Sequence, residues 1–170
     1  LAVGNLLAGI SHNNLVVRKS DYTIVDKDVF FTSSIQPIED LSERDFGRPG
    51  SDSRSGMLPP KLARIMINLA QVSTESTLLD AFCGSGTVLT EAAAMGYKKL
   101  IGADILEKAV EDTTTNLEWI KNKKNIANFK ANIYHCDAET LNSVIASESI
   151  DAIVSEPYMG NPLKGNEKEK

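Results

Sequence analysis

The stretch Thr77-Leu-Leu-Asp-Ala-Phe-Cys-Gly-Ser-Gly-Thr87 decides the fold of this chain. Its first six residues form a short, mostly apolar run that is typical of a buried strand. The two glycines that follow predict a sharp turn, because glycine adopts backbone conformations that other residues avoid. Residues 86–95 then read as a helix that Gly96 ends. A buried strand that turns sharply into a helix is the repeating unit of parallel sheets.

The same alternation continues on both sides of this stretch. The expected segments are a helix that begins at Pro60, strands at 77–82, 100–103, 132–136 and 151–155, and helices at 86–95, 107–121 and 138–146. Strict alternation implies parallel strands joined by right-handed crossovers. We therefore expect an α/β fold with a doubly wound sheet. Such sheets have five or more strands, so the others either lie beyond this chain or come from its N-terminal part.

The first 56 residues differ in character from the rest. Short β-rich runs lie at 15–17, 22–25 and 29–32, and the last two predict a hairpin. Residues 43–56 are rich in glycine, serine and charge, which predicts a loop. We therefore expect a β-rich N-terminal segment and loop, 1–56, and one main domain, 57–170, which we expect to continue beyond the C-terminal end of this sequence.

Composition excludes several classes of protein. The chain has 170 residues, of which 42% are hydrophobic and 24% charged, the balance of a soluble globular protein. No apolar run approaches the roughly 18 residues of a membrane helix. The net charge of −5 disfavours a free-standing nucleic-acid binder. The two cysteines, Cys83 and Cys136, are too few for a disulfide framework or a zinc site, which favours a reduced, cytoplasmic protein with no metal.

Ligands of doubly wound sheets bind beyond the carboxyl ends of the strands. After the first strand, Gly84 and Gly86 let the backbone approach a ligand, and the next helix presents N–H groups that attract negative groups. The third glycine of a dinucleotide fingerprint would fall at Leu89, which disfavours an NAD-type oxidoreductase. The plainer alternative is an ordinary strand–helix turn.

Acidic residues follow the first three strands. Asp80 ends the first strand, where it can receive a ligand ammonium group or a loop N–H. Asp104 follows the second strand and either accepts both hydroxyls of a ribose or caps the next helix. Ile105 beside it can pack against an adenine ring. Asp137 follows the third strand and either bonds an adenine amino group or caps the helix expected at residue 138.

The fourth strand is followed by Ser155-Glu-Pro-Tyr-Met-Gly160. A flat nucleobase can stack on Tyr158 while its exocyclic NH₂ group donates to Glu156 and to a carbonyl near Pro157. This arrangement would aim the amino lone pair at an electrophile. The alternative is a loop that happens to contain proline.

At these residues the chain resembles S-adenosylmethionine-dependent amino-methyltransferases. The stretch 80–87, followed by Glu91-Ala-Ala, looks like their motif I. Glu156-Pro-Tyr158 resembles their catalytic motif, (Asp/Asn/Ser)-Pro-Pro-(Tyr/Phe), with one proline instead of two. Residues 44–49 and 56–63 resemble the approach to motif I in THUMP-associated tRNA guanine-N2 methyltransferases, an RNA methylase family. The resemblance covers roughly residues 40–162.

The resemblance implies a Rossmann-like class I methyltransferase fold and S-adenosylmethionine as cofactor. The residues implied in cofactor binding are Asp80, Phe82, Cys83, Gly84, Gly86, Thr87, Asp104, Ile105, Asp137 and Ala138. Those implied in catalysis are Glu156, Pro157 and Tyr158. An alignment from the aromatic residue would place Ser155 at the acidic position. We prefer Glu156, because Asp151 then keeps the usual distance to the carboxylate.

The implied reaction is methyl transfer to the exocyclic amine of guanine in tRNA, forming N2-methylguanosine. The implied partners are tRNA, a THUMP-type or other basic module outside this chain that supplies affinity, and an activator subunit. Within the chain the densest basic stretch is Arg44, Arg48, Arg54 and Lys61, which either reaches phosphates or belongs to a solvated loop. Other hypotheses stay open: the acceptor can be adenine N6, cytosine N4 or a protein glutamine, and the chain can be a cofactor-free scaffold for an active partner.

Overall fold

The computed structural model describes residues 21–34, 36–51 and 57–157. The chain divides into two compact units, Leu1–Asp40 and Leu41–Lys170. The domain boundary expected between residues 56 and 57 stays a prediction.

The described part of the first unit contains the expected hairpin. Strands β1 (Tyr22–Val25) and β2 (Asp28–Phe31) pair antiparallel. Asp26 takes a φ of 54° in the turn between them, a conformation that aspartate tolerates better than most residues. The two strands form a sheet of their own, so they add no strand to the larger sheet. The strand expected at 15–17 lies outside the described residues.

The prediction of a loop from residue 43 is wrong for its first part. Helix α2 spans Ile38–Phe46, and Gly47 donates its N–H to the carbonyl of Glu43 over 2.8 Å. Glu39 near the start and Arg44 near the end of this helix both suit its dipole. Arg44 is also buried against an acidic partner from a distant helix. This contact favours the helical conformation of residues 43–46, and the local composition contains no information about it.

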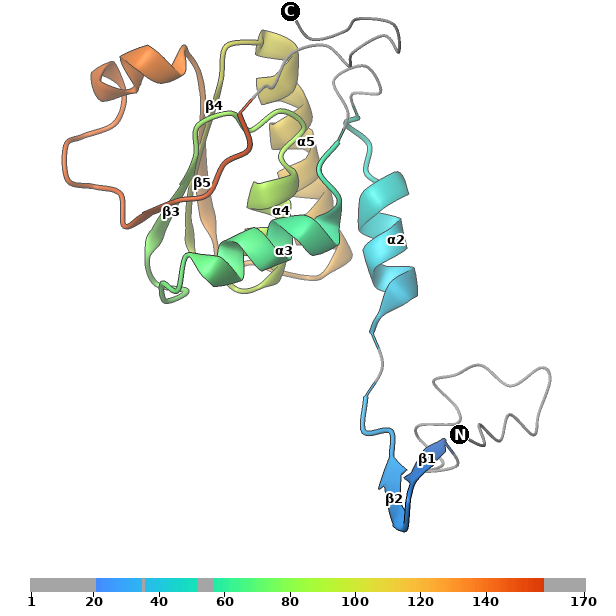
Figure 1. Ribbon diagram of the computed structural model, residues 1–170. Coiled ribbons are helices and arrows are strands. Elements are labelled where there is room, and N and C mark those ends of the chain that lie inside the picture. The colour runs from blue at the N-terminus through green and yellow to red at the C-terminus, as the bar shows by residue number, and fades with distance from the viewer. Residues whose placement is uncertain (1–20, 35, 52–56, 158–170) are drawn as a thin grey trace, which may run out of the picture. The chain divides into compact units, whose positions relative to one another are not determined.

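The second unit is built around a four-stranded parallel sheet (Figure 1). Its elements are α3 (Pro60–Leu69), β3 (Thr77–Asp80), α4 (Thr87–Ala94), β4 (Lys99–Asp104), α5 (Glu107–Lys123), β5 (Lys130–His135), the 3₁₀ helix η1 (Ala138–Ser143) and β6 (Ala152–Ile153). The strand order is β5-β4-β3-β6, with every neighbouring pair parallel. The predicted α/β fold with a Rossmann-like parallel sheet is confirmed.

The helix predicted at 138–146 is shorter than expected. Residues 138–143 form a 3₁₀ helix instead of an α-helix over 138–146, and none of its residues is buried. Thr140 and Ser143 hydroxyls donate to nearby backbone carbonyls, which offers the chain an alternative to regular helical bonds. A segment without a buried apolar face gains little from packing, so a longer helix is not favoured.

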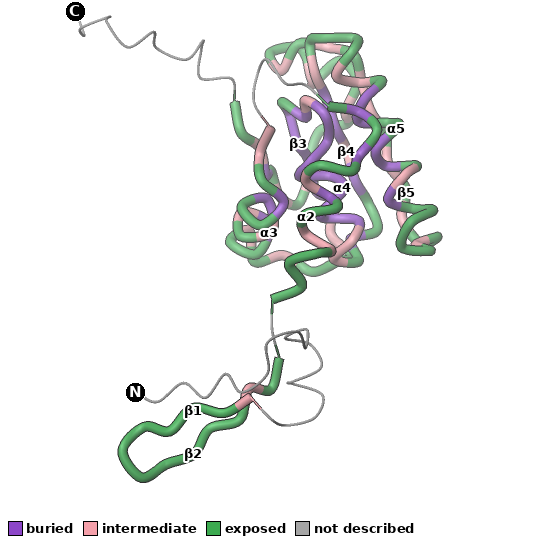
Figure 2. Tube along the Cα trace, turned by 90° about the vertical axis from the view of Figure 1, so that its right-hand side faces the viewer, coloured by how far each residue is buried: buried purple, intermediate pink, exposed green. Residues whose placement is uncertain are grey.

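The core lies between the sheet and the three helices α3, α4 and α5, which cover one face in Figure 1. Buried residues concentrate in β3, β4 and α4, whereas β1 and β2 are exposed along their length (Figure 2). At Gly102 in β4, an added Cβ would lie only 2.6 Å from Leu89 Cδ1 of α4. This close approach fixes α4, and therefore the turn before it, against the sheet. No helix in the described residues is long and apolar enough to cross a membrane.

Candidate functional site at the carboxyl edge of the sheet

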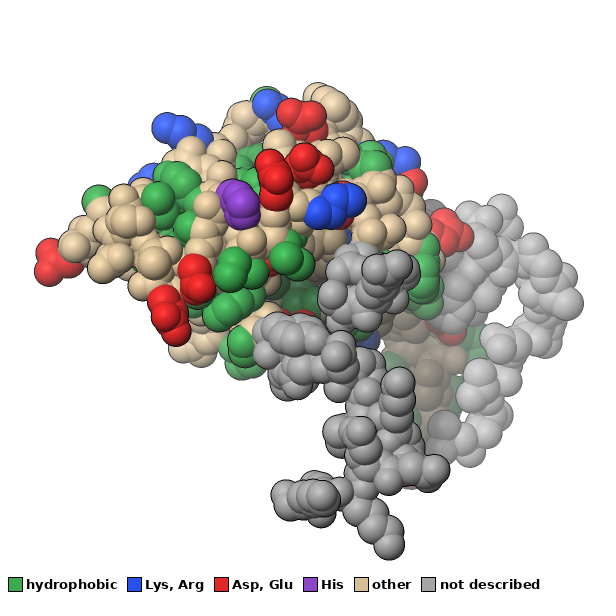
Figure 3. Space-filling view, turned by 90° about the horizontal axis from the view of Figure 1, so that it is seen from above, with side chains coloured by type: hydrophobic (Ala, Val, Ile, Leu, Met, Phe, Trp, Pro, Cys, Tyr) green, Lys and Arg blue, Asp and Glu red, His purple; other side chains and the backbone are tan. Residues whose placement is uncertain are grey.

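Parallel register brings the predicted site residues to one edge of the sheet. Asp80 pairs with Gly102, and Asp104 pairs with His135 on the next strand. The segments after β3, β4, β5 and β6 therefore all begin at the same end of the sheet (Figure 1). Acidic and apolar side chains both lie at this end of the molecule, which Figure 3 shows from above.

The glycine turn, residues 83–87, connects β3 to α4. Gly84 and Gly86 take φ values of 51° and 80°, in the left-handed region that favours glycine. A Cβ at Gly84 would have nothing within 4 Å, so this side of the turn faces open space. A Cβ at Gly86 would instead lie 2.9 Å from the Thr113 hydroxyl oxygen. The two glycines thus serve different purposes: Gly84 leaves room for a ligand, and Gly86 allows tight packing.

Asp104 joins the end of β4 to this turn. Its Oδ2 accepts the N–H of Gly84 over 2.9 Å, and its Oδ1 accepts the N–H of Leu106 over 2.9 Å. Each carboxylate oxygen has a second lone pair, which leaves acceptor capacity for ribose hydroxyls. Ile105 beside it is 62% exposed, as an apolar surface for an adenine ring would need to be. Leu106 is the N-cap of α5 and no side chain caps this helix, so the capping role expected as the alternative for Asp104 is not present.

Asp137 lies after β5, where its Oδ1 accepts the N–H of Glu139 over 2.9 Å. The carboxylate therefore caps η1, which was one of its two expected roles. Contact with an adenine amino group stays a prediction, and so does the binding role of Ala138, the first residue of η1.

Asp80 is almost completely buried, at 2% exposure. Its Oδ1 accepts the N–H of Phe82 over 3.2 Å and the hydroxyl of Ser155 over 2.5 Å. Burial raises the pKa of Asp80 to about 6; these two hydrogen bonds oppose the rise, and the charges of Asp104 and Glu156 add to it. Of the two roles expected for Asp80, the structure contains the bond to a loop N–H. The ammonium role stays a prediction.

The segment after β6 places Glu156 and Pro157 in exposed positions at the same edge. Ser155, just before them, makes two hydrogen bonds to the segment that leads into the glycine turn. Its hydroxyl donates to Asp80, and its Oγ accepts the N–H of Phe82 over 3.1 Å. Phe82 itself is 45% exposed. Tyr158, the third residue expected in catalysis, lies outside the described residues.

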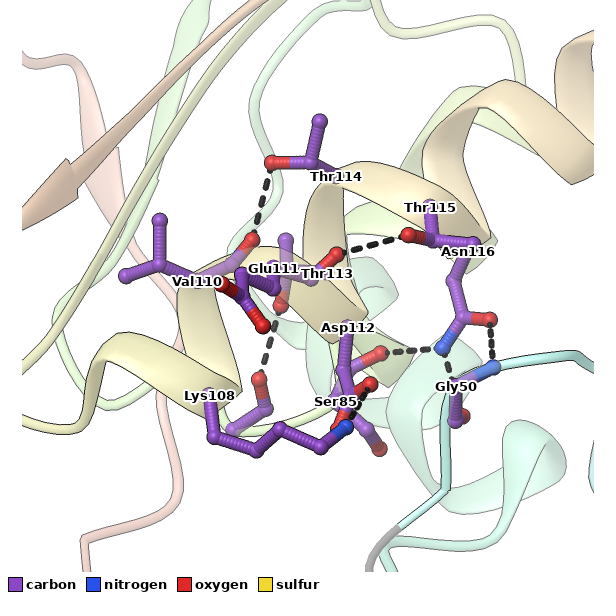
Figure 4. A network of polar contacts seen from close by, with 11 residues as sticks. Gly50, Ser85, Lys108, Val110, Glu111, Asp112, Thr113, Thr114, Thr115 and Asn116 are labelled. Atoms are coloured by element: carbon purple, nitrogen blue, oxygen red, sulfur yellow. Dashed lines mark hydrogen bonds and ion pairs between the residues drawn. The ribbon is translucent and has the colours of Figure 1, made fainter.

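Two buried residues of α5 support the glycine turn from behind, and the sequence reasoning missed both. Thr113 donates its hydroxyl to the carbonyl of Gly84 over 2.8 Å, and Asn116 donates its amide to the carbonyl of Ser85 over 2.7 Å (Figure 4). Both side chains are fully buried. They share a helical face with the buried Leu117 and Ile120. The signal that could have identified them is that Thr113 and Asn116 lie three positions from each other and four positions before the apolar residues of the buried face, where a polar side chain needs a partner in the core.

Cys83 is a packing residue in this structure. Burial raises the pKa of its thiol to about 12, and the hydroxyl of Thr113 lies 3.5 Å from its sulfur. Cys83 and Cys136 are both free thiols. No group of three or more histidine, cysteine, aspartate or glutamate side chains in the described residues could hold a metal ion.

A cavity of about 330 Å³ lies elsewhere on the sheet. Its wall includes Thr77, Lys99 and Lys130, which are the first residues of β3, β4 and β5. These residues stand at the opposite end of the strands from the glycine turn. The cavity is therefore not part of the candidate site, which is an open edge.

Known proteins resemble this chain in sequence. A tRNA (guanine(10)-N2)-dimethyltransferase of Methanothermobacter thermautotrophicus is 40% identical over 118 residues, covering 69% of this chain and 30% of the relative. One of the same name from Methanocaldococcus jannaschii is 31% identical, covering 98% of this chain and 46% of the relative. The chain thus spans less than half the length of these two relatives.

Solved structures resemble the fold. TrmN from Thermus thermophilus aligns with a TM-score of 0.54 at 22% identity, covering 78% of this chain and 36% of that one. A possible methylase from Clostridium difficile 630 also gives 0.54, at 21% identity, covering 72% of this chain and 40% of that one. At these identities the likeness concerns the fold alone.

The family model that matches residues 50–169 is described as UPF0020, RMKL-like, methyltransferase domain. This match covers the four-stranded sheet and every described residue of the candidate site. The methyltransferase class expected from the motifs is thereby confirmed. The chain belongs to the RMKL-like methyltransferase domain family.

Proposed function

We propose that this chain binds S-adenosylmethionine and transfers its methyl group to the exocyclic amine of a guanine in tRNA, forming N2-methylguanosine. The observation that carries the proposal is the bond from Gly84 N–H to Asp104 Oδ2, 2.9 Å long. It joins a ligand-accessible turn to a carboxylate with spare acceptor capacity, in a chain of the methyltransferase family. The choice of tRNA guanine follows the names of the archaeal relatives.

The residues at this edge fit the chemistry of the cofactor. The open space beside Gly84 admits a ligand close to the backbone. Asp104 would accept the ribose hydroxyls, and the exposed side chains of Ile105 and Phe82 would cover the adenine. The N-terminus of α4, where no side chain caps the helix, would attract the carboxylate of the methionine moiety. Asp137 would accept a hydrogen bond from the adenine amino group.

The chemistry needs positioning more than it needs a strong base. S-adenosylmethionine supplies an electrophilic methyl group on a sulfonium sulfur, and the guanine nitrogen supplies the electron pair. Glu156 and the carbonyl near Pro157 would accept hydrogen bonds from the guanine NH₂ group, which favours the positive charge that builds on nitrogen. The proton leaves nitrogen afterwards, to Glu156 or to water. Stacking of the base on Tyr158 belongs to the same proposal.

Binding of tRNA by this chain alone would be weak, because its net charge is −5. Arg44 and Arg48, from the basic stretch that could have reached phosphates, are buried at 3% and 6% exposure. We therefore propose that a basic module outside this chain, of THUMP type or similar, supplies affinity, and that an activator subunit completes the enzyme. The place of action would be the cytoplasm, where tRNA is available.

The test is methyl transfer from labelled S-adenosylmethionine to total tRNA by the full-length protein, followed by nucleoside mass spectrometry. N2-methylguanosine is the expected product. Methylated adenine, cytosine or protein glutamine would reassign the acceptor. Calorimetry separates the other hypotheses: binding of NAD alone would indicate an oxidoreductase, and binding of neither ligand would indicate a scaffold.

Two variants divide the proposed roles. Asp104→Ala should lose cofactor affinity, because the ribose loses its acceptor and the turn loses its bond to β4. Glu156→Ala should lose mainly turnover and keep cofactor binding. Normal affinity in the first variant, or normal turnover in the second, would contradict the role assigned to that residue.

A further inference from the structure

The side chain of Asn116 is a junction between three segments that are far apart in sequence. Its Nδ2 donates to the carbonyl of Ser85 over 2.7 Å and to the carbonyl of Gly50 over 2.8 Å, and its Oδ1 accepts the N–H of Gly50 over 2.8 Å (Figure 4). The amide is fully buried, and both of its donor hydrogens and its acceptor oxygen are used. It connects α5, the glycine turn and the segment before α3.

Arg48 makes a second connection between that segment and the turn. Its Nη1 donates to the hydroxyl of Thr87, the first residue of α4. Arg48 is 6% exposed, and its Nε and Nη2 form no hydrogen bond within the described part of the chain. Burial lowers the pKa of this guanidinium, which Asp45 and Glu91 partly oppose. A buried cation of this kind contributes little net stability, since its replacement by an apolar residue of similar volume often leaves the free energy of unfolding unchanged or higher.

The segment carrying these contacts, residues 44–50, is seated tightly on α4 and α5. Arg44 Nε donates to Glu91 Oε1 over 2.5 Å, one helical turn beyond Thr87 on the same face of α4. At Gly50, an added Cβ would lie 2.9 Å from the Cα, Cβ and carbonyl oxygen of Asp112. Only glycine allows the backbone to pass so close to α5. We call residues 44–50 the strap.

The contacts from α5 fix the direction of the peptide groups in the turn. In a trans peptide the N–H points opposite to the C=O. Thr113 holds the Gly84 carbonyl towards α5, so the N–H of Ser85 points away from α5. Asn116 holds the Ser85 carbonyl, and the N–H of Gly86 then donates to the carbonyl of Cys83 over 2.7 Å. The turn is therefore shaped from behind, before any ligand contacts its open side.

We propose that the strap holds the glycine turn in its ligand-binding conformation through two side chains, Asn116 of α5 and its own Arg48. Both side chains are then positioning residues for the cofactor. Neither side chain touches the open side of the turn; they act on ligand affinity through Ser85 and Thr87. The proposal rests on the proposed function, since it assumes that the turn binds S-adenosylmethionine. Preorganisation of this kind raises affinity by lowering the cost of ordering the site on binding.

The decisive variant is Asn116→Asp, which keeps the acceptor for Gly50 N–H but turns a carboxylate oxygen towards two carbonyl oxygens. The matched control is Thr115→Val, on the next residue of α5, whose exposed hydroxyl bonds only locally to the Glu111 carbonyl. Calorimetry with S-adenosylhomocysteine measures the dissociation constant, and circular dichroism measures the melting temperature. We expect at least a tenfold weaker Kd for Asn116→Asp, and a Kd within about twofold of wild type for the control.

Arg48 gives an independent comparison. Arg48→Met removes the donor to Thr87 and keeps the apolar stem, whereas Arg48→Lys keeps a cation and one donor within reach. We expect Arg48→Met to weaken S-adenosylhomocysteine binding and Arg48→Lys to restore it in part. In tRNA methylation by the full-length protein, the KM for S-adenosylmethionine should rise while the KM for tRNA stays unchanged.

The outcomes separate this inference from the proposed function. Lower melting temperatures with unchanged Kd in Asn116→Asp and Arg48→Met would show a purely structural strap and overturn the inference alone. If Asn116→Asp fails to fold, the Arg48 pair decides by the same criterion. A wild-type chain that binds no S-adenosylhomocysteine would overturn the proposed function, and this inference with it.

Discussion

Ser155 donates its hydroxyl hydrogen to Oδ1 of Asp80 over 2.5 Å, so the segment before Glu156 is joined to the end of β3. Asp80 is the last residue of β3, and Ser155 follows the neighbouring strand β6, which is far from β3 in sequence. The same Ser155 oxygen accepts the N–H of Phe82. The candidate catalytic segment and the candidate cofactor residues Asp80 and Phe82 therefore share one hydrogen-bonded cluster around the buried carboxylate of Asp80.

The pKa of Asp80 predicts that stability depends on pH. Its folded value is about 6 against an ordinary value of 3.8, so the folded chain holds this proton more tightly than the unfolded chain. The contribution of Asp80 is therefore fully present below about pH 4 and is lost as the pH rises through about 6. A shift of this size corresponds to about 3 kcal/mol in the free energy of unfolding.

Asp80→Asn should remove this pH dependence and leave the acceptor for Phe82 N–H in place. Urea unfolding of wild type and variant between about pH 4 and pH 7 measures the difference. The stability gained by the variant relative to wild type should grow with pH across this range. A difference that stays constant with pH would show that Asp80 does not titrate there.

Gly84 and Gly86 should respond differently to alanine. In Gly86→Ala the strain of a positive φ adds to the contact with Thr113, so we expect a loss of stability greater than the roughly 1–2 kcal/mol of the strain alone. In Gly84→Ala the new Cβ meets no protein atom, so only the strain remains, but the methyl group enters the proposed ligand space. Its main effect should be weaker S-adenosylhomocysteine binding. Unfolding curves and calorimetry on both variants check this, and equal effects on stability would contradict it.

Glu91 is the one charged residue of α4, and its substitution should destabilise the fold. It is fully buried and accepts from Arg44, which is itself 3% exposed. Glu91→Gln removes the negative charge from this buried ion pair, so we expect a loss of about 3 kcal/mol in the free energy of unfolding. Arg64→Gln removes a longer and partly exposed contact to the same carboxylate and should cost less than about 1 kcal/mol. Urea unfolding measures both, and similar losses would argue against a special role for the Arg44 pair.

The two thiols should differ in reactivity. Cys83 is 5% exposed and burial raises its pKa to about 12, whereas Cys136 is only partly buried. Because the thiolate is the reactive form, an alkylating reagent should modify Cys136 well before Cys83 in the folded chain. Mass spectrometry of peptides after timed labelling measures the order. Denaturant should abolish the difference, and early labelling of Cys83 without denaturant would contradict the burial described above.

Several features followed from local sequence pattern. The alternation of apolar strands and helices from Pro60 onward predicted the parallel sheet, and the glycine turn was predicted at its observed place. The convergence of Gly84, Asp104, Asp137 and Glu156 on one edge also followed, because parallel strands end on the same side. These properties depend on the spacing of apolar residues along the chain and on the direction of the strands, and both can be recognised from residues that are close in sequence.

Other features depended on partners that are distant in sequence. The helical state of residues 43–46, the burial of Arg44 and Arg48, and the support of the glycine turn by Thr113 and Asn116 all involve such contacts. Arg44 lies 47 positions from Glu91, and Asn116 lies 66 from Gly50. A charged or polar residue is stable in the core only where its partner is placed beside it. The sequence alone therefore determined where the chain would turn and which edge would carry the site, and the tertiary structure decided which polar side chains would hold that turn.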